Sequence, residues 1–242
     1  MVMRPYVICH IVSSVDGKID GDWFGMEEIR PALAESNRIR ENYQCSAVLY
    51  GSVTMAETYA NGFVTELPAA AVTYPREDYL VQPEAELFFV SLDPAGKVAY
   101  QKGIIEKKGR KAHAVEILCE AVSDDYLHDL RAKGVSYLFA GQDSLDLQLA
   151  LVKLKDLLKV ERALICGGGI IDFSFLKAGL MDELSLVVAP VTDGGVQMPT
   201  VFDSSAFAAG EKIAFSLLRA EVLPGDSLWL RYQPKNRSKQ EE

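Results

Sequence analysis

The chain has 242 residues, with a hydrophobic fraction of 49% and a charged fraction of 24%, which is ordinary for a globular protein. Its net charge of −9 argues against nucleic acid or an anionic membrane as the main partner, although local N–H groups can still bind an anion. No stretch approaches the roughly 18 apolar residues of a membrane span, and no signal peptide is evident. The four cysteines are scattered, so we expect reduced thiols in a cytoplasmic protein and no metal site.

Apolar runs of strand length alternate with segments of helical periodicity along the chain. In chain order we predict a strand at 6–12, a helix at 27–43, a strand at 47–50, a helix at 52–59 capped by Ser52, strands at 87–91 and 114–118, a helix at 123–133 capped by Ser123, a strand at 137–140, a helix at 145–158, a strand at 163–166, a helix from 170, a strand at 184–188, and a hairpin of 213–222 with 228–232. Residues 60–85 carry three prolines and are predicted to lack regular structure.

This alternation predicts a fold class. We expect one α/β domain over residues 1–234 and a polar, frayed tail over 235–242. Its sheet should be mostly parallel, with helices on both faces and an antiparallel C-terminal hairpin.

Three glycines, Gly167, Gly168 and Gly169, stand between a predicted strand and a predicted helix. Glycines at such a turn let the backbone approach a ligand, and the N–H groups and dipole of the first helical turn favour a phosphate. The triplet can equally be a tight turn that packs the helix onto its strand, because it is not the G-x-G-x-x-G dinucleotide fingerprint. Spacing alone leaves both interpretations open.

Other candidate ligand groups follow further predicted strands, where open α/β sheets bind their ligands. Gly51 to Thr54 is small and rich in hydroxyls, which suits either a second phosphate cradle or a plain N-cap. Ser91 is either a phosphate donor or a turn hydroxyl, and Asp16 before Gly17 is also ordinary turn chemistry. Two cradles on one sheet would fit a dinucleotide. The three histidines lie apart within predicted elements, and we expect them to be structural.

The ordered set of these motifs resembles the reductase domain that forms the C-terminal half of the bacterial bifunctional riboflavin-biosynthesis deaminase-reductase, a relative of dihydrofolate reductase. The resemblance covers most of residues 6–232. Three stretches carry it: Ser13 to Ile19, like the family's S-x-D-G-K-I; Ala47 to Thr54, like its strand-G-x-x-T helix start; and Gly167 to Gly169 followed by Phe175 to Pro190. It implies a dihydrofolate-reductase-like three-layer fold and a reductase that stands alone, since the zinc deaminase signature is absent.

The resemblance also implies where the ligands bind. The NADPH pyrophosphate would lie between the two helix starts, the adenosine 2′-phosphate near Ser91, and the nicotinamide near the backbone of Val12 and Ile19. A phosphoribosylamino-pyrimidine would lie on the loop around Asp16, where hydride reduces its ring-opened imine to the ribitylamino product. Glu35 falls about where dihydrofolate reductases hold the acid that grips the pteridine, or is a solvated helix glutamate.

These implications give a set of expected site residues. The catalytic residues would be Asp16 and Lys18, the substrate contacts Ser14 and Glu35, and the cofactor contacts Val12, Ile19, Gly51, Ser52, Thr54, Ser91, Gly167, Gly168, Gly169, Ile170 and Ile171.

The chain departs from the family pattern at two positions. Cys166 stands where the family usually has a glutamate, and the neutral Ser52 follows Gly51, where related sequences often offer a cation. The missing carboxylate weakens the assignment of a riboflavin-pathway substrate more than it weakens the assignment of NADPH as the cofactor. A reductase of the same fold acting on a pterin or another small substrate stays open, as does a non-catalytic nucleotide-binding or assembly protein. The pair Asp16 and Lys18 favours an enzyme, since a binding relic has no reason to keep it.

Reductases of this resemblance are commonly homodimers. The C-terminal hairpin carries more apolar residues than one sheet face needs: Ile213, Phe215, Leu217, Leu218, Leu228, Trp229 and Leu230. Exposed apolar area of that kind marks an interface, whereas helices of the same subunit could instead bury both strands.

Overall fold

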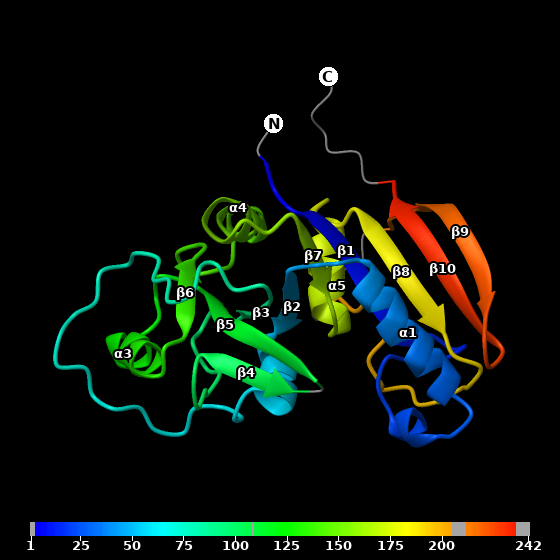
Figure 1. Ribbon diagram of the computed structural model, residues 1–242, viewed down its shortest axis with the longest axis horizontal. Coiled ribbons are helices and arrows are strands. Elements are labelled where there is room, and N and C mark those ends of the chain that lie inside the picture. Colours follow the sequence, from blue (N-terminus) through cyan, green and yellow to red (C-terminus); the bar gives the residue numbers. More distant parts are fainter. Residues whose placement is uncertain (1–2, 108, 205–211, 236–242) are drawn as a thin grey trace. The chain divides into compact units, whose positions relative to one another are not determined.

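The computed structural model describes residues 3–107, 109–204 and 212–235 (Figure 1). The chain divides into two compact units. Unit 1 comprises residues 1–5 and 46–163, and unit 2 comprises residues 6–45 and 164–242. The expectation of one domain over residues 1–234 stays a prediction, and the tail from residue 236 lies outside the described residues.

Unit 1 is built on parallel strands. Its elements are β2 (Ala47–Gly51), α2 (Ser52–Thr54), the π-helix η2 (Met55–Tyr59), β3 (Phe88–Leu92), β4 (Ile104–Lys107), β5 (Arg110–Leu118), α3 (Asp124–Ala132), β6 (Ser136–Phe139) and α4 (Leu147–Leu158). The strand order is β4-β5-β3-β2, with β6 also on β5. Strands β2, β3 and β5 pair in parallel, and the outer edge of β5 is shared by the antiparallel β4 and the parallel β6.

Unit 2 contains the antiparallel end predicted from the sequence. Its elements are β1 (Tyr6–Ser13), the 3-10 helix η1 (Asp22–Gly25), α1 (Arg30–Asn42), α5 (Gly169–Lys177), β8 (Glu183–Val188), β9 (Phe215–Leu223) and β10 (Ser227–Pro234), together with the end of β7 (Arg162–Ile165). The strand order is β7-β1-β8-β10-β9, in which β1 and β8 pair in parallel and β10 is antiparallel to both of its neighbours.

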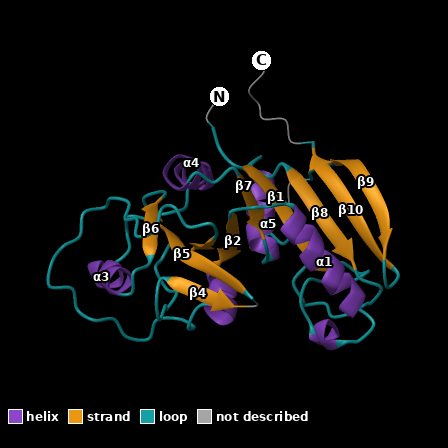
Figure 2. Ribbon diagram, in the orientation of Figure 1, coloured by secondary structure: helices purple, strands orange, loops and turns teal. Residues whose placement is uncertain are grey.

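Helices cover both faces of the unit 2 strands, as predicted. Helix α1 crosses β1 and β8 (Figure 2) and buries Ala32 and Ile39 with Val187. On the opposite face, Leu176 of α5 packs with Cys9 of β1 and with neighbouring apolar side chains. Among the described residues, no helix is long and apolar enough to cross a membrane. All four cysteines are described, and none is in a disulfide.

Four details differ from the predicted elements. Helix α1 begins at Arg30, three residues late, with Pro31 in its first turn. Gly51, and not Ser52, is the N-cap of α2, and it makes no side-chain cap hydrogen bond. Strand β4 was not predicted, because its sequence is short and ends in charged residues. Strand β5 begins at Arg110, earlier than expected, because it forms a hairpin with β4.

Residues 60–87 contain no helix or strand, as predicted for 60–85, yet side chains hold them in place. Asp125 Oδ1 accepts a hydrogen bond from Ala70 N at 2.7 Å, and Asp124 Oδ1 accepts one from Tyr74 N at 3.1 Å. The Arg131 guanidinium lies 4.7 Å from the Tyr74 ring centroid and 4.4 Å from that of Tyr79. The start of α3 and one arginine therefore add to the two isolated β-bridges of this segment, Phe63 with Val98 and Tyr79 with Tyr137.

His10 joins three elements of unit 2. Its Nδ1 lies 2.9 Å from Ser185 Oγ on β8, and its Nε2 lies 2.9 Å from Ser36 Oγ on α1. Trp229 Nε1 of β10 donates to the same Ser185 hydroxyl at 2.8 Å. Burial lowers the pKa of His10 to about 4, with the positive charge of Arg40 as a smaller cause. The imidazole is therefore neutral at pH 7 and structural, as expected for a core histidine.

This lowered pKa predicts acid lability. Between pH 6.5 and pH 4 the unfolded chain binds a proton at His10 that the folded chain does not, so the contribution of His10 to stability is lost as the pH falls through that window. In urea unfolding, the free energy of unfolding of the parent relative to His10→Gln should therefore fall by about 2 kcal/mol from about pH 7.5 to about pH 5. His113, whose pKa burial lowers, and Asp172 and Glu116, whose pKa values burial raises, titrate in both proteins and cancel in this comparison. Equal slopes in both proteins would contradict the assignment.

The β9–β10 hairpin leaves apolar side chains exposed. Leu217 and Leu218 of β9 are 57% and 50% exposed, and Val222 is 81% exposed. Other side chains of the hairpin are core, since Leu223 and Trp229 pack under α1. Strand β9 also ends the strand order of unit 2. An exposed, partly apolar edge strand is a common site of association.

The predicted homodimer can be tested at this surface. Light scattering at micromolar concentration should give a mass near twice the 26.6 kDa of one chain. Val222→Lys combined with Leu228→Lys should give a monomer, because two charges would be buried in the interface. Val72→Lys, at a residue of unit 1 that is 59% exposed, is the matched control and should stay dimeric. A monomeric parent would leave the hairpin as an exposed face of a single chain.

Candidate functional site

The loop after β1 folds back on itself through the predicted substrate residues. Ser14 N donates to Lys18 O at 2.9 Å, and Lys18 N donates to Ser14 Oγ at 2.9 Å. Gly17, with φ +80°, supplies the left-handed residue that closes the turn. We call residues 13–19 the substrate loop, after the role that the family resemblance implies for them. It brings Ser14, Asp16 and Lys18 close together, and their roles toward a substrate stay predictions.

Asp16 is an exposed carboxylate with three hydrogen-bond donors. The Ser14 hydroxyl donates to Oδ1 at 2.5 Å, Gly194 N donates to Oδ2 at 2.8 Å, and Asp193 N donates to Oδ1 at 3.2 Å. These donors, the Ser14 hydroxyl first, hold the pKa of Asp16 well below its usual value. Asp16 is therefore ionised throughout the neutral range.

The segment after β8, residues 191–203, runs beside the substrate loop. Ile19 N donates to Pro199 O at 3.0 Å, and Lys18 pairs with Thr200 as an isolated β-bridge. The Lys18 ammonium donates to Met198 O at 3.4 Å. Sequence reasoning assigned no role to the 191–203 segment, because its glycines and polar residues show no periodicity.

The same segment reaches the glycine turn. Asp203 N donates to Gly169 O at 3.0 Å, and the Asp203 carboxylate accepts from Thr200 N at 2.9 Å and from Thr200 Oγ1 at 2.5 Å. The 191–203 segment thus connects the substrate loop with the start of α5 inside unit 2. A second acid, Asp203, stands beside the glycines where only donors were expected.

The three glycines have different roles. A Cβ on Gly169 would lie 2.3 Å from Thr200 O and 2.6 Å from Asp203 Oδ2, so this glycine is required for packing. A Cβ on Gly168, which is the N-cap of α5 and has φ +87°, would meet nothing within 4 Å. Gly167 also has a positive φ, of 112°. The turn therefore has a packed side and an open side where a ligand can reach the helix start.

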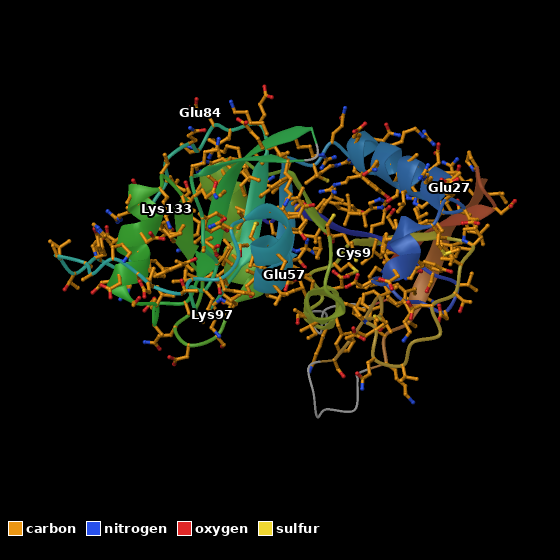
Figure 3. The ribbon with its side chains drawn as sticks, turned by 90° about the horizontal axis from the view of Figure 1, so that it is seen from below. Cys9, Glu27, Glu57, Glu84, Lys97 and Lys133 are labelled. Atoms are coloured by element: carbon orange, nitrogen blue, oxygen red, sulfur yellow. The ribbon has the colours of Figure 1, made fainter. Side chains whose placement is uncertain are left out.

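A buried acid lies in the first turn of α5. The Asp172 side chain is fully buried, and burial raises its pKa to about 8, with the nearby charge of Asp203 as a smaller cause. The Cys9 thiol on β1 (labelled in Figure 3) interacts with this carboxyl and favours its charged form slightly. At neutral pH Asp172 keeps its proton, so the helix start carries no charge from this residue. An Asp on the apolar side of a helix is the sequence signal that indicates this buried acid.

The remaining predicted site residues lie in varied surroundings. Glu35 accepts from Arg38 at 2.9 Å on the surface of α1. Val12, Ile19, Gly51, Ser52 and Thr54 are half-buried, Ile170 is exposed and Ile171 is half-buried. Ser52 and Thr54 belong to unit 1, where they lie in the three-residue helix α2. The second candidate phosphate site, Gly51 to Thr54, is therefore a short helical turn.

Ser91 is completely buried in β3 of unit 1. It pairs in register with Glu116 of β5, whose carboxyl accepts from the Tyr100 hydroxyl at 2.5 Å. Burial raises the pKa of Glu116 well above its usual value, with Asp93 as a second cause. A phosphate contact by Ser91 stays a prediction, and it requires the covering side chains to move.

Comparison with known proteins places the chain in a family. The model of the RibD C-terminal domain matches residues 5–228, so the chain belongs to the RibD C-terminal domain family. A 2,5-diamino-6-ribosylamino-4(3H)-pyrimidinone 5′-phosphate reductase of Methanothermobacter thermautotrophicus is 26% identical over 240 residues, which cover 96% of this chain and 100% of the relative. A reductase of the same name from Archaeoglobus fulgidus is 25% identical over 207 residues, covering 85% and 89%.

Solved structures support the fold. A pyrimidine reductase-like protein from Corynebacterium diphtheriae has a TM-score of 0.68 at 16% identity, over 96% of this chain and 93% of that one. A riboflavin biosynthesis reductase from Saccharomyces cerevisiae has a TM-score of 0.60 at 11% identity, over 96% and 90%. The predicted dihydrofolate-reductase-like fold and the resemblance to the reductase domain are confirmed.

The open side of the glycine turn predicts the effect of substitutions there. NADPH should raise the melting temperature of the parent protein by mass action. Gly168→Asp should abolish that shift, because it adds a negative charge where the phosphate should lie. Gly168→Asn has the same size and tolerance for positive φ but no charge, and should keep part of the shift. If NADPH raised the melting temperature of the aspartate variant as much as that of the parent, the placement of the phosphate at this turn would be wrong.

Proposed function

We propose that this protein is an NADPH-dependent reductase that transfers hydride to a phosphoribosylamino-pyrimidine of riboflavin biosynthesis, or to a close analogue, in the cytoplasm. The observation that carries the proposal is the 191–203 segment, which joins the substrate loop to the glycine turn within unit 2. Membership of the RibD C-terminal domain family and the names of its relatives support it. A loop that carries Asp16 and Lys18, joined in this way to a turn whose open side suits an anion, fits a substrate and a cofactor that meet.

The residues at the start of α5 fit a phosphate-bearing cofactor. The open side of Gly168 leaves room for the pyrophosphate, and the protonated Asp172 adds no repulsion. The Asp203 carboxylate is a cost at this site, which its hydrogen bonds to Thr200 reduce. The assignment of Gly51, Ser52 and Thr54 of unit 1 to the cofactor stays a prediction of the family resemblance. When bound, NADPH supplies the hydride.

The substrate loop would then manage charge and the proton. Reduction of an imine adds hydride to the carbon and a proton to the nitrogen. Lys18 carries a positive charge on the loop, and its 3.4 Å hydrogen bond to Met198 O is a weak surface contact that a substrate group can replace. We assign to Lys18 the donation of the proton to the imine nitrogen. Ser14 is then a substrate contact, and Asp16 lies beside it.

Replacement of Lys18 tests this assignment. Lys18→Ala should lower kcat for the pyrimidine by about 100-fold, the lower end of the range for a general acid, and leave NADPH affinity within a few-fold. Lys18→Arg should recover part of the substrate affinity but little of the turnover. Lys177→Ala, an equal charge change at the exposed end of α5, is the matched control and should behave as the parent.

The readout is NADPH oxidation with and without the pyrimidine. Equal loss of NADPH binding in Lys18→Ala would place the loop in the cofactor half of the site, and unchanged turnover would reduce it to a structural turn. A parent that binds NADPH but oxidises it with neither the pyrimidine nor a pterin would favour a non-catalytic nucleotide-binding protein.

A further inference from the structure

The 191–203 segment contacts the substrate loop through its backbone on both sides of its tip, residues 193–198. Val191 O accepts a hydrogen bond from the loop at 2.7 Å before the tip, and Pro199 O accepts one at 3.0 Å after it. Within the part of the chain that the structure describes, no backbone-to-backbone hydrogen bond joins the tip itself to the loop. The tip therefore depends on side chains for its position.

One carboxylate provides most of that support. Asp16 accepts hydrogen bonds from Gly194 N at 2.8 Å and from Asp193 N at 3.2 Å. Gly194 has φ +73°, which glycine adopts without strain, so the tip can aim two successive N–H groups at one acceptor. The Ser14 hydroxyl, at 2.5 Å, orients the same carboxylate from within the loop.

The tip also forms one wall of a cleft in unit 2. The cleft has a volume of about 410 Å³. Its lining residues are Asp22, Trp23, Met26, Thr192, Asp193 and Met198. Because Asp193 both lines the cleft and donates to Asp16, a movement of the tip changes the shape of the cleft beside the substrate loop.

The hydrogen bonds of Asp16 suit an anchor better than a proton carrier. A general acid or base works best when its pKa lies near the working pH. The three donors instead stabilise the carboxylate form. Loss of the carboxylate would leave N–H and hydroxyl groups of the tip and the loop without their acceptor.

We propose that Asp16 is a positioning residue: its carboxylate fixes the tip of the 191–203 segment against the substrate loop, and so sets the affinity for the pyrimidine. This inference rests on the proposed function, since the pyrimidine is the ligand whose affinity is set. It assigns Asp16 to substrate binding through the tip and leaves the proton to Lys18.

Asp16→Asn tests the proposal, because it removes the charge and one acceptor at constant size. The KM and the Kd for the pyrimidine should rise at least about tenfold, the loss expected for hydrogen bonds to a charged group. The kcat and the Kd for NADPH should stay within about threefold, and the pH profile of kcat should keep its shape from about pH 5 to about pH 9. Hydrogen exchange at the amides of Asp193 and Gly194 should quicken about tenfold.

Asp20→Asn is the matched control. It is an equal charge change just after the same loop, at an exposed side chain that accepts a hydrogen bond from the neighbouring Gly21 N at 2.8 Å. This variant should give the parent's KM, kcat and amide exchange. Asp16→Glu, which restores the charge on a longer side chain, should recover part of the pyrimidine affinity.

Three results would overturn the proposal. A fall in kcat at unchanged KM, or the loss of one limb of the pH profile, would make Asp16 a proton carrier. Unchanged amide exchange at the tip would show that Asp16 does not anchor it. A parent that neither binds nor reduces the pyrimidine would instead overturn the proposed function, and amide exchange alone would then decide whether Asp16 holds the tip.

Discussion

The parallel pairing of β1 with β8 is the constraint on which the candidate site depends. Six residues of each strand pair in register, from Ile8 opposite Glu183 to Ser13 opposite Val188. Because both strands run in the same direction, the loop after β1 and the segment after β8 leave the sheet at the same edge. Their side-by-side exit allows Asp16 to reach the backbone of that segment. His10, in the middle of the same pairing, ties the sheet to its covering helix.

An acidic protein that is to bind an anion must reduce the repulsion from its nearby carboxylates, and unit 2 places three carboxyl groups in surroundings that do so. Asp16 is surrounded by N–H and hydroxyl donors. Asp203 is held by the backbone and side chain of Thr200. Asp172 is buried without a counter-charge and keeps its proton, since ionisation there costs more than protonation. The net charge of −9 therefore says little about the charge that a ligand meets at the glycine turn.

Hydrophobic periodicity predicted most of the strands and helices, because buried faces repeat at fixed spacing. It missed β4, whose pattern is too short, and it misplaced the start of α1 and the cap at Gly51. For the glycine triplet, both interpretations apply to different residues: Gly169 is needed for packing and Gly168 faces open space. The 191–203 segment could not be predicted, since its contacts are hydrogen bonds between backbone groups and from backbone N–H groups to carboxylates, which leave no periodic trace. The burial of Ser91 was likewise hidden, because a buried and an exposed serine look alike in a sequence.

The side chains that hold residues 60–87 couple the local unfolding of this loop to that of α3. Closing a loop of this length costs conformational entropy, and its only β-pairing among the described residues is two isolated bridges, Phe63 with Val98 and Tyr79 with Tyr137. If the loop opened, Asp124 and Asp125 would lose N–H partners at the helix start, and Arg131 would lose its aromatic neighbours. Loop and helix should therefore open together as one cooperative segment. Within unit 1, the part of the chain with the least regular backbone is then no easier to unfold than the helix that holds it.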